Sequence, residues 1–335
     1  MARSCGRACI VPGASEHIEA PVVSSGPAPG LFRRLHLALA LLALACAAPR
    51  DAKGPRDPAR PPARATAGAT AVDDFGDTVS LEPARRIVSL SPMTTELLFA
   101  IGAGDRVVGR TDFDVWPAAA KRVPSVGAGI RPNVEQVLAA RPELVVLYAA
   151  NVNHGAARTL RAEGVRTLAL KSDRLEDFPR AAALLGAVAG ADAAAAVVSD
   201  SVRRTLDRVA ASVAGLPRPR VLWFLWDNPP MVLGNGSYQS ELLAIAGGEN
   251  VYRDRPEAAA QVSMEDILTR RPEVVFADPG ADVQLRTSAR WSGAGERRRW
   301  RIVTIDDTLL NRPGVTLGMA AVSLARALHP GWRGP

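Results

Sequence analysis

Histidine and cysteine are scarce in this sequence of 335 residues. The residues concerned are His17, His36, His154, His329, Cys5, Cys9 and Cys46. Transition-metal sites need clusters of such side chains, and a catalytic histidine needs a nucleophile within hydrogen-bond reach. Because these residues are scattered along the chain, the sequence predicts no metal site, no resident cofactor and no catalytic residue.

Motifs for nucleotide hydrolysis and serine hydrolysis are also missing. The chain has neither a G-x-x-x-x-G-K-[ST] loop nor a G-x-S-x-G elbow. Its net charge of +7 comes from arginines spread along the chain, whereas a nucleic-acid-binding face would show basic runs interleaved with aromatic residues. The sequence therefore argues against ATP hydrolysis, serine hydrolase chemistry and nucleic-acid binding.

An export signal is indicated by LFRRLHLALALLALAC, from Leu31 to Cys46. Two arginines precede an apolar run that is too short to span a bilayer, and small residues close the run, as in a secretory signal. The stretch resembles a bacterial lipobox, so we expect Cys46 to be lipidated. Plain secretion and an N-terminal membrane anchor are the alternatives. Residues 1–30 do not look like a leader, and we expect the true start near Leu31.

Residues 1–46 are thus predicted to be leader and signal, and the protein is expected in the periplasm or on the outer face of a bacterial membrane. Residues 47–71 are rich in Pro, Ala, Arg and Gly, which predicts a flexible tether. Buried-type strands then alternate with helical stretches. The predicted strands are Arg86–Leu90, Leu144–Tyr148, Thr167–Leu170, Val221–Trp226, Val274–Phe276 and Ile302–Ile305. Such alternation predicts an α/β fold with parallel sheets.

A weak internal repeat supports two α/β units. NVEQVLAARPELV from Asn133 and SMEDILTRRPEVV from Ser263 share Glu, Leu and Arg-Pro-Glu at a constant offset. Thr95-Glu-Leu-Leu and Ser240-Glu-Leu-Leu form a second echo and predict helix starts. Residues 175–216 lie between the two copies, are rich in Ala, Leu and Val, and predict one long helix that Gly186 and Gly190 are placed to interrupt.

The predicted fold is therefore α/β, with two Rossmann-like lobes with parallel sheets joined by one long backbone helix. A ligand cleft is expected between the lobes. The expected division is an N-terminal lobe at 72–174, the connecting backbone helix at 175–216 and a C-terminal lobe at 217–335.

Arg86-Ile-Val-Ser-Leu-Ser-Pro, followed by Thr95-Glu-Leu, resembles the opening of the helical-backbone periplasmic solute-binding proteins of ABC importers for cobalamin, haem and ferric siderophores. The Asn133 block, Trp226-Asp-Asn-Pro-Pro and Gly247-Gly-Glu-Asn continue this resemblance, which covers nearly all of 84–330. It is nearest to the cobalamin-binding branch. It implies a binding protein rather than an enzyme, with rigid lobes that close little on the ligand.

The resemblance also implies that one glutamate on each lobe docks onto arginines of an ABC permease, whose ATPase subunits hydrolyse ATP. The matching positions are Glu135 and Glu265, which the internal repeat independently makes equivalent. Paired carboxylates on two lobes suit bivalent docking on a symmetric partner.

Candidate ligand residues follow the strands, because open parallel sheets bind ligands beyond the carboxyl ends of their strands. They are Ser91, Pro92, Thr94, Tyr148, Trp226, Asp227, Asn228 and Asp307, with Trp116 in the loop after the second short strand. Aromatic walls suit a broad, mostly neutral corrin disc, and polar groups suit its amides. The resemblance implies that Trp116 and Tyr148 are aromatic ligand contacts. Trp223 is expected in the core, and Trp291 and Trp300 at the surface or between lobes.

Other ligands stay open, because the sequence departs from the cobalamin-binding branch at Thr94 and at 258–260. Tyr148 with Arg110 or Arg131 would suit haem, and convergence of Arg110, Arg131 and Arg312 would suit an anionic ferric siderophore. Two other classes of protein are considered. One is an enzyme with the same two-lobed architecture, and the export signal argues against it. The other is a surface scaffold that binds no small molecule.

Overall fold

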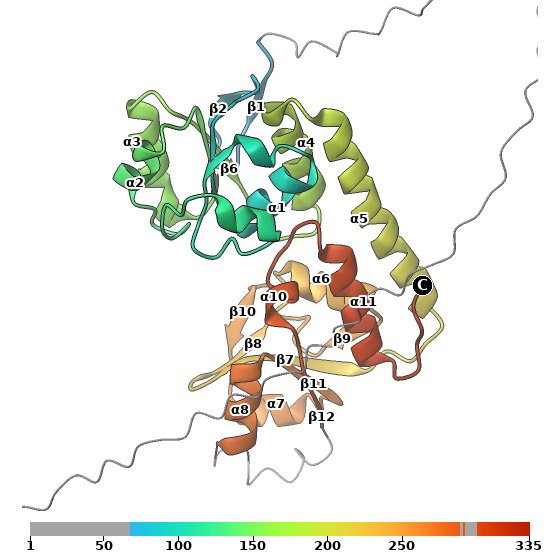
Figure 1. Ribbon diagram of the computed structural model, residues 1–335. Helices are drawn as coiled ribbons and strands as arrows, with labels where there is room; N and C mark the ends of the chain where they lie inside the picture. Colours follow the sequence, from blue (N-terminus) through green and yellow to red (C-terminus); the bar gives the residue numbers. More distant parts are fainter. Residues whose placement is uncertain (1–67, 289–290, 292–299) are drawn as a thin grey trace, which may run out of the picture. The chain divides into compact units, whose positions relative to one another are not determined.

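The computed structural model describes residues 68–288, 291 and 300–335, which belong to one compact unit (Figure 1). The predicted leader, the predicted lipidation site Cys46 and residues 47–67 of the predicted tether lie outside the described residues. The first strand begins at Thr70, slightly before the predicted start of the folded part at Val72. No described helix is long and apolar enough to cross a membrane.

The N-terminal lobe is built on a parallel sheet. In spatial order its strands are β4 (Val107–Gly109), β3 (Ile87–Leu90), β5 (Leu144–Tyr148) and β6 (Arg166–Leu170). An antiparallel ribbon of β1 (Thr70–Val72) and β2 (Thr78–Ser80) precedes it. Its helices are α1 (Pro92–Ala100), α2 (Val134–Ala139) and α3 (His154–Ala162), with 3-10 turns at Gly104–Arg106, Ala118–Arg122 and Asn151–Asn153. The three strands predicted for this lobe are present.

Both faces of this sheet are covered, which explains why its strands are apolar at nearly every position. Ile87 and Leu144 face a core shared with α1, whereas Val88 and Val145 face a second core shared with α2 and α3. The sheet is therefore the middle layer of this lobe.

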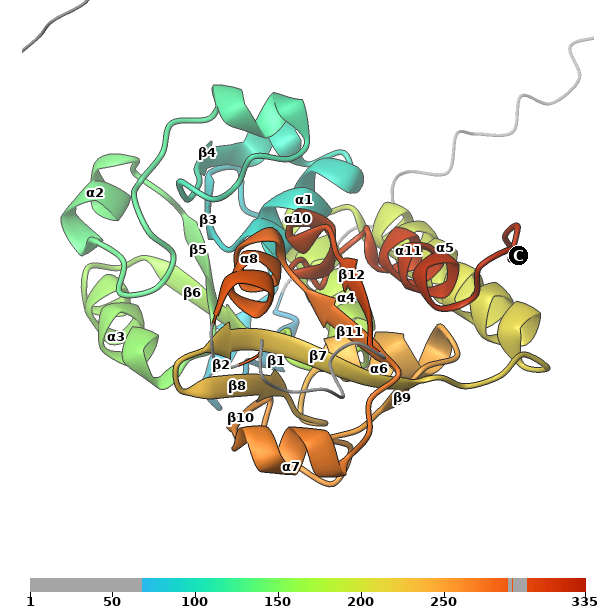
Figure 2. The same ribbon diagram turned by 90° about the horizontal axis from the view of Figure 1, so that it is seen from below.

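The C-terminal lobe has a sheet in the order β10 (Ala259–Gln261), β8 (Pro230–Leu233), β7 (Arg220–Asp227), β11 (Val274–Ala277) and β12 (Arg301–Thr304), with β9 (Glu249–Asn250) also paired to β7 (Figure 2). Its helices are α6 (Tyr238–Ile245), α7 (Met264–Thr269), α8 (Pro279–Thr287), α10 (Asp307–Leu310) and α11 (Leu317–Leu328). Strands β7, β11 and β12 are parallel, as predicted, and β9, which was not predicted, is also parallel to β7.

The parallel prediction fails for β8 and β10, which make the sheet of this lobe mixed. Strand β8 is antiparallel to β7, and β10 is antiparallel to β8. Only Asn228 and Pro229 separate β7 from β8. So short a link permits a hairpin, whereas a parallel neighbour needs a crossover of a dozen or more residues.

The single helix predicted over 175–216 is two helices, α4 (Asp177–Ala189) and α5 (Asp192–Val213). The break lies at Gly190, whose φ of 60° is left-handed and ends α4. Helix α5 packs against α4 and also against α6 and α11 of the C-terminal lobe. It is therefore the long helix that joins the two lobes (Figure 1).

The internal repeat is a repeat of backbone geometry. Arg141 and Arg271 both have left-handed φ, 49° and 47°, after equivalent short helices. Arg86 donates to the carbonyl of Ala140 (2.6 Å), and Arg220 donates to the carbonyl of Arg270 (2.7 Å). The order β3-α1-β4-α2-β5-α3-β6 recurs as β7-α6-β9-α7-β11-α8-β12, with β8 and β10 inserted. The second echo starts one turn earlier than predicted, because α1 begins at Pro92 and α6 at Tyr238.

Three tryptophans of the C-terminal lobe are internal. Trp223 is 4% exposed, as predicted for a core residue. Trp291 and Trp300, which we expected at the surface or between lobes, are 0% and 9% exposed. They belong to the core of the C-terminal lobe, where Trp291 stacks edge-on against Phe224 and Trp300. Nearby arginines in the sequence misled the prediction, because they say nothing about where the indoles point.

Two glycine substitutions should separate backbone strain from helix propensity. Gly190→Ala forces a β-carbon into the left-handed region and should lower the free energy of unfolding by about 1 kcal/mol. Gly155→Ala places a methyl group in open space inside α3 and should raise it by about 0.5–1 kcal/mol. Urea denaturation measures both. Equal effects would contradict the assignment of Gly190 as an obligatory left-handed helix end.

Candidate ligand-binding site

A cavity of about 300 Å³ lies at the carboxyl ends of β3 and β5. Its lining residues are Leu90, Ser91, Pro92, Met93, Thr111, Phe113, Ala128, Gly129, Ile130, Tyr148, Ser172, Asn311, Arg312 and Pro313. Most belong to the N-terminal lobe, whereas residues 311–313 follow α10 in the C-terminal lobe. The cavity therefore draws on both lobes at the strand ends, where parallel sheets hold ligands.

Three predicted ligand residues line this cavity: Ser91, Pro92 and Tyr148. Ser91 is the residue before α1, and Pro92 begins that helix, where its missing N–H is no loss. Tyr148 ends β5, and its hydroxyl donates to Asp173 Oδ1 (2.5 Å). Burial and the bond to Asp173 raise the pKa of the Tyr148 phenol. The phenol therefore stays protonated, and its hydrogen is used in the bond to Asp173.

Two other predicted residues of this lobe are placed elsewhere. Thr94 is buried, its hydroxyl oxygen lies 2.6 Å from that of Ser89, and it donates to the carbonyl of Ser91 (3.0 Å). Thr94 therefore supports the start of α1 and does not belong to the cavity lining. Trp116 is 41% exposed in the loop between β4 and α2 and is also absent from that lining.

Three predicted residues of the C-terminal lobe, Trp226, Asp227 and Asn228, lie at or just after the end of β7. Trp226 is 51% exposed, and its indole donates to the carbonyl of Asn228 (3.1 Å). Asp227 accepts from the indole of Trp291 (2.5 Å). These residues are outside the cavity lining given above. The side chain of Asp307 lies outside the described ones.

Sequence reasoning missed Phe113, Ile130, Asn311 and Pro313, and it named Arg312 only as a candidate ligand for an anionic siderophore. Phe113 is 67% exposed and Ile130 is 50% exposed, although both border the cavity. Phe113 lies only three residues before Trp116 in the same loop, and an aromatic residue in a loop after a strand was the available signal. The contribution of 311–313 had no local signal, because it depends on how the C-terminal lobe meets α1.

Charge is nearly absent from the cavity lining. Among the described lining residues Arg312 alone is charged, and its Nη1 lies 3.2 Å from Oε1 of Glu96 on α1. Arg110, an alternative anion ligand, donates to the carbonyls of Thr111, Ala120 and Val123 instead. Arg131 is not a lining residue, so the three arginines do not converge on this cavity.

A buried polar network holds the loop that carries Phe113. Asp114 is 1% exposed and accepts from the backbone N–H of Thr111 (3.0 Å), from the Thr111 hydroxyl (2.6 Å) and from the Thr95 hydroxyl (2.6 Å). Burial raises the pKa of Asp114, and these hydrogen bonds oppose the rise. The network fixes the loop against α1.

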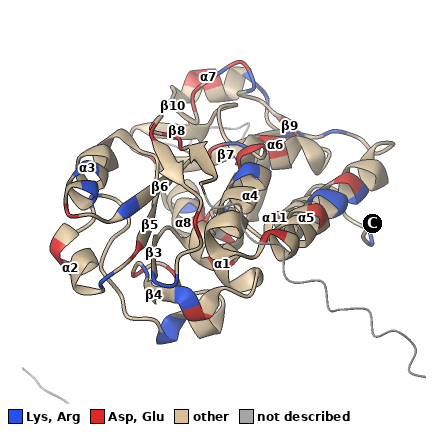
Figure 3. Ribbon diagram, turned by 90° about the horizontal axis from the view of Figure 1, so that it is seen from above, with Lys and Arg blue, Asp and Glu red and all other residues tan. Residues whose placement is uncertain are grey.

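Glu135 and Glu265 occupy matching places on the two lobes. Each is the second residue of a short helix, α2 or α7. Each helix is capped by the side chain of the residue before it, Asn133 or Ser263. Both glutamates are exposed, and neither forms an ion pair within the described part of the chain. Acidic residues mark both helices in Figure 3.

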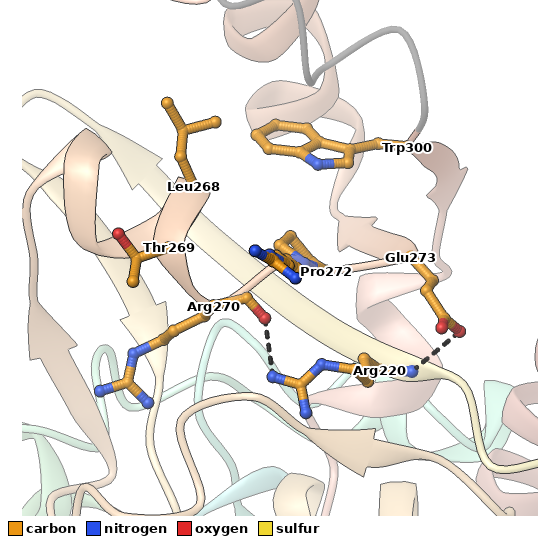
Figure 4. A pocket seen from close by; sticks show the side chains of 8 residues that line it. Arg220, Leu268, Thr269, Arg270, Pro272, Glu273 and Trp300 are labelled. Carbon is orange, nitrogen blue, oxygen red and sulfur yellow. Dashed lines mark hydrogen bonds between the residues drawn. The ribbon is translucent and has the colours of Figure 1, made fainter.

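A second hollow, of about 1160 Å³, lies at the opposite ends of the strands of the C-terminal lobe (Figure 4). Arg220, Glu273 and Trp300 lie at or just before the starts of β7, β11 and β12. Two of the three arginines that line it are engaged within the protein, since Arg220 pairs with Glu249 and Arg270 pairs with Asp254 and Asp266. The smaller cavity is therefore the better ligand site. Among the described residues, no group of His, Cys, Asp and Glu could hold a metal ion.

The role of Asp114 can be tested by truncation. Asp114→Ala leaves the donors of Thr95 and Thr111 buried without their acceptor, and should lower the free energy of unfolding by about 2 kcal/mol. Asp112→Ala, in the same loop but exposed, should change it by less than about 0.5 kcal/mol. Urea denaturation of both variants distinguishes them, and similar losses would show that the network does not hold the loop.

Comparison with known proteins agrees with this architecture. The chain is 27% identical over 250 residues to the vitamin B12-binding protein of Salmonella typhimurium, an alignment that covers 75% of this chain and 92% of that one. It is 26% identical over 256 residues to the vitamin B12-binding protein of Yersinia pestis, covering 75% and 89%.

Among solved structures, the periplasmic vitamin B12 binding protein of Vibrio cholerae matches with a TM-score of 0.63 at 24% identity, covering 73% of this chain and 97% of that one. A periplasmic heme binding protein from Pseudomonas aeruginosa matches with a TM-score of 0.65 at 24% identity, covering 75% and 95%. These structures share the fold. The sequence model of the periplasmic binding proteins matches residues 87–322, which include both lobes and the helices between them, and the chain therefore belongs to the periplasmic binding protein family.

Proposed function

We propose that this protein is the substrate-binding component of an ABC importer, which captures cobalamin or a related corrinoid and delivers it to a membrane permease. Capture is non-covalent and needs no cofactor, and ATP is hydrolysed by the ATPase subunits of the importer. The family and the names of the curated relatives support this role. The observation that carries the ligand assignment is the nearly neutral lining of the cavity.

The lining suits a neutral macrocycle fringed by amides. Leu90, Met93, Phe113 and Ile130 supply apolar surface, and polar groups without charge come from Ser91, Ser172 and Asn311. Apolar walls with a few hydrogen-bonding groups are typical of small-molecule sites. Among the described lining residues the one charge is that of Arg312, which is already paired with Glu96, so an anionic ligand gains little from it.

The cavity is less suited to haem or a ferric siderophore. Haem iron needs an axial ligand such as tyrosinate or histidine. The phenol of Tyr148 is bonded to Asp173 and has a raised pKa, which opposes ionisation. His154 packs against Phe75 instead of lining the cavity. The arginines that an anionic siderophore would need do not converge there, so haem and siderophores rank below a corrinoid.

The cavity encloses only part of such a ligand. Its volume of about 300 Å³ is at the lower end for small-molecule sites. Exposed aromatic side chains at strand ends and loops, Phe113, Trp116 and Trp226, give further stacking surface for a broad disc. We propose that these residues extend the site, together with Asp227, Asn228 and Asp307.

We further propose that the protein works outside the cytoplasmic membrane, anchored through a lipid on Cys46 and the tether 47–71. The functional division is an N-terminal lobe at 72–174, the connecting segment 175–216 and a C-terminal lobe at 217–335. Glu135 and Glu265 then dock the two lobes onto the permease.

Isothermal titration of the purified protein with cyanocobalamin, haemin and a ferric siderophore tests the ligand assignment. Cyanocobalamin alone should bind saturably at one site. Phe113→Ala should weaken that binding by about ten-fold, because one aromatic contact contributes about 1.5 kcal/mol. Val197→Ala, an exposed apolar residue on α5, should leave it unchanged. Binding of haemin or siderophore alone would reject a corrinoid ligand, and no binding at all would favour a scaffold.

Docking is tested with the cognate permease in liposomes. Glu135→Ala and Glu265→Ala should each weaken association with the permease, and the double variant should lose more than either, because the two sites act together. Ligand affinity should not change. Glu163→Ala, exposed at the end of α3, is the control and should dock normally. Normal docking by the double variant would assign the interface to other residues.

A further inference from the structure

The repeated motif Ser/Thr-Glu-Leu-Leu has a structural use that neither ligand capture nor docking explains. Its glutamates are Glu96 on α1 and Glu241 on α6, the equivalent helices of the two lobes. Each pairs with an arginine that lies outside its own lobe. Within the described part of the chain, several other ion pairs join residues three or four positions apart on one helix, whereas these two join residues of different lobes.

The first pair joins α1 to the C-terminal lobe. Arg312 Nη1 lies 3.2 Å from Glu96 Oε1, and the two side chains are 15% and 1% exposed. The backbone of the same segment lies close against α1, since a β-carbon on Gly314 would stand 3.5 Å from Glu96 Oε2 and from Met93. Residues 311–313 are also the part of the cavity lining that the C-terminal lobe supplies.

The second pair joins α6 to the segment that follows β6. Arg174 forms an ion pair with Glu241, and the two side chains are 38% and 26% exposed. The backbone N–H of Leu175 donates to Glu241 Oε2 (2.7 Å), and Arg174 donates to the carbonyl of Asn235 (2.8 Å). The contact thus ties the start of the connecting helices to the C-terminal lobe.

The two pairs are related by the internal repeat. Arg174 follows β6 and Arg312 follows β12, and these strands occupy equivalent places at the edges of the two sheets. In both cases the glutamate comes from the helix after the first strand of one lobe, and the arginine follows the last strand of the other.

We propose that Glu96–Arg312 and Glu241–Arg174 form a reciprocal clamp that fixes the spacing of the two lobes, with Glu96 as the positioning residue that holds segment 311–313 on the cavity. The two arms differ in burial. The Glu96 arm is nearly closed to water, whereas the Glu241 arm is partly solvated.

Burial makes the Glu96 arm sensitive to protons. Desolvation raises the pKa of Glu96 to about 7, the charge of Arg312 opposes the rise, and the nearby carboxylate of Asp114 adds to it. These are the charged groups that act on Glu96 from the packed elements. Because the pKa is raised, the closed segment favours the protonated carboxyl, and ionisation above pH about 7 weakens the closure. Arg312 offsets part of this cost, so its charge matters most where Glu96 is ionised.

The clamp goes beyond the proposed function, because it requires no particular ligand. Hydrogen exchange of the unliganded full-length protein, followed by mass spectrometry, tests it directly. At pH 8, Arg312→Gln should speed exchange of residues 308–317 by at least about ten-fold, since it leaves the ionised, buried carboxylate of Glu96 without its counter-charge. Residues 171–177 and the β5 core should keep their wild-type rates. Glu241→Gln is the matched control and should speed exchange in 171–177, where Leu175 donates to Glu241.

The wild type provides a test that needs no substitution. After correction for intrinsic rates, residues 308–317 should exchange more slowly at pH 5.5 than at pH 8, because the buried site favours the protonated carboxyl of Glu96. Glu96→Gln, which is neutral at both pH values, should abolish this difference. The clamp is overturned if Arg312→Gln leaves 308–317 unchanged at pH 8, or if both variants speed exchange everywhere. A protein that fails to bind cobalamin yet shows these exchange changes would reject the ligand and keep the clamp.

Discussion

The cavity depends on one apolar core that continues from one lobe into the other. Ile87 of β3, Leu185 of α4, Val209 of α5 and Phe276 of β11 belong to the same buried cluster. Close-packed interiors resist rearrangement, because a shift of one element loses contacts along the whole interface. Two sheets that share such a core through α4 and α5 keep a defined spacing. The strand ends that border the cavity are therefore placed before any ligand arrives.

The duplicated sequence repeats both a backbone turn and the surface positions next to it. The Arg-Pro-Glu corner repeats a backbone turn, in which left-handed Arg141 or Arg271 ends a short helix and leads into β5 or β11. The corner ends α2 and α7, and the Asn133 and Ser263 caps start them, so that Glu135 and Glu265 are displayed at matching positions. The Arg-Pro-Glu repeat is therefore explained first by the backbone turn that it forms. Because this turn recurs in both lobes, a function that needs a pair of surface sites finds them at matching positions.

Local patterns were enough to predict the parallel core strands, because buried strands such as β5 are apolar at nearly every position. They were not enough for β8, which begins at Pro230 and pairs with β7 through a hairpin. Thr94 and Tyr148 show the same limit within the site. Thr94 follows β3 and Tyr148 ends β5, yet Thr94 turns inward to Ser89 while Tyr148 borders the cavity. Which way a side chain faces depends on helix starts, and α1 began one turn earlier than its motif indicated.

Contacts between distant parts of the chain were beyond any local pattern. Arg312 was considered as an anion ligand, but in the structure it lies beside Glu96, and a paired arginine adds little net charge to a cavity. Arg110 is also unsuited to bind an anion, because its N–H groups donate to backbone carbonyls. The selectivity argued for this site therefore follows from what the arginines are bonded to. Because the charged groups near the cavity are paired within the protein, ligands are distinguished by their shape, their apolar surface and their hydrogen bonds.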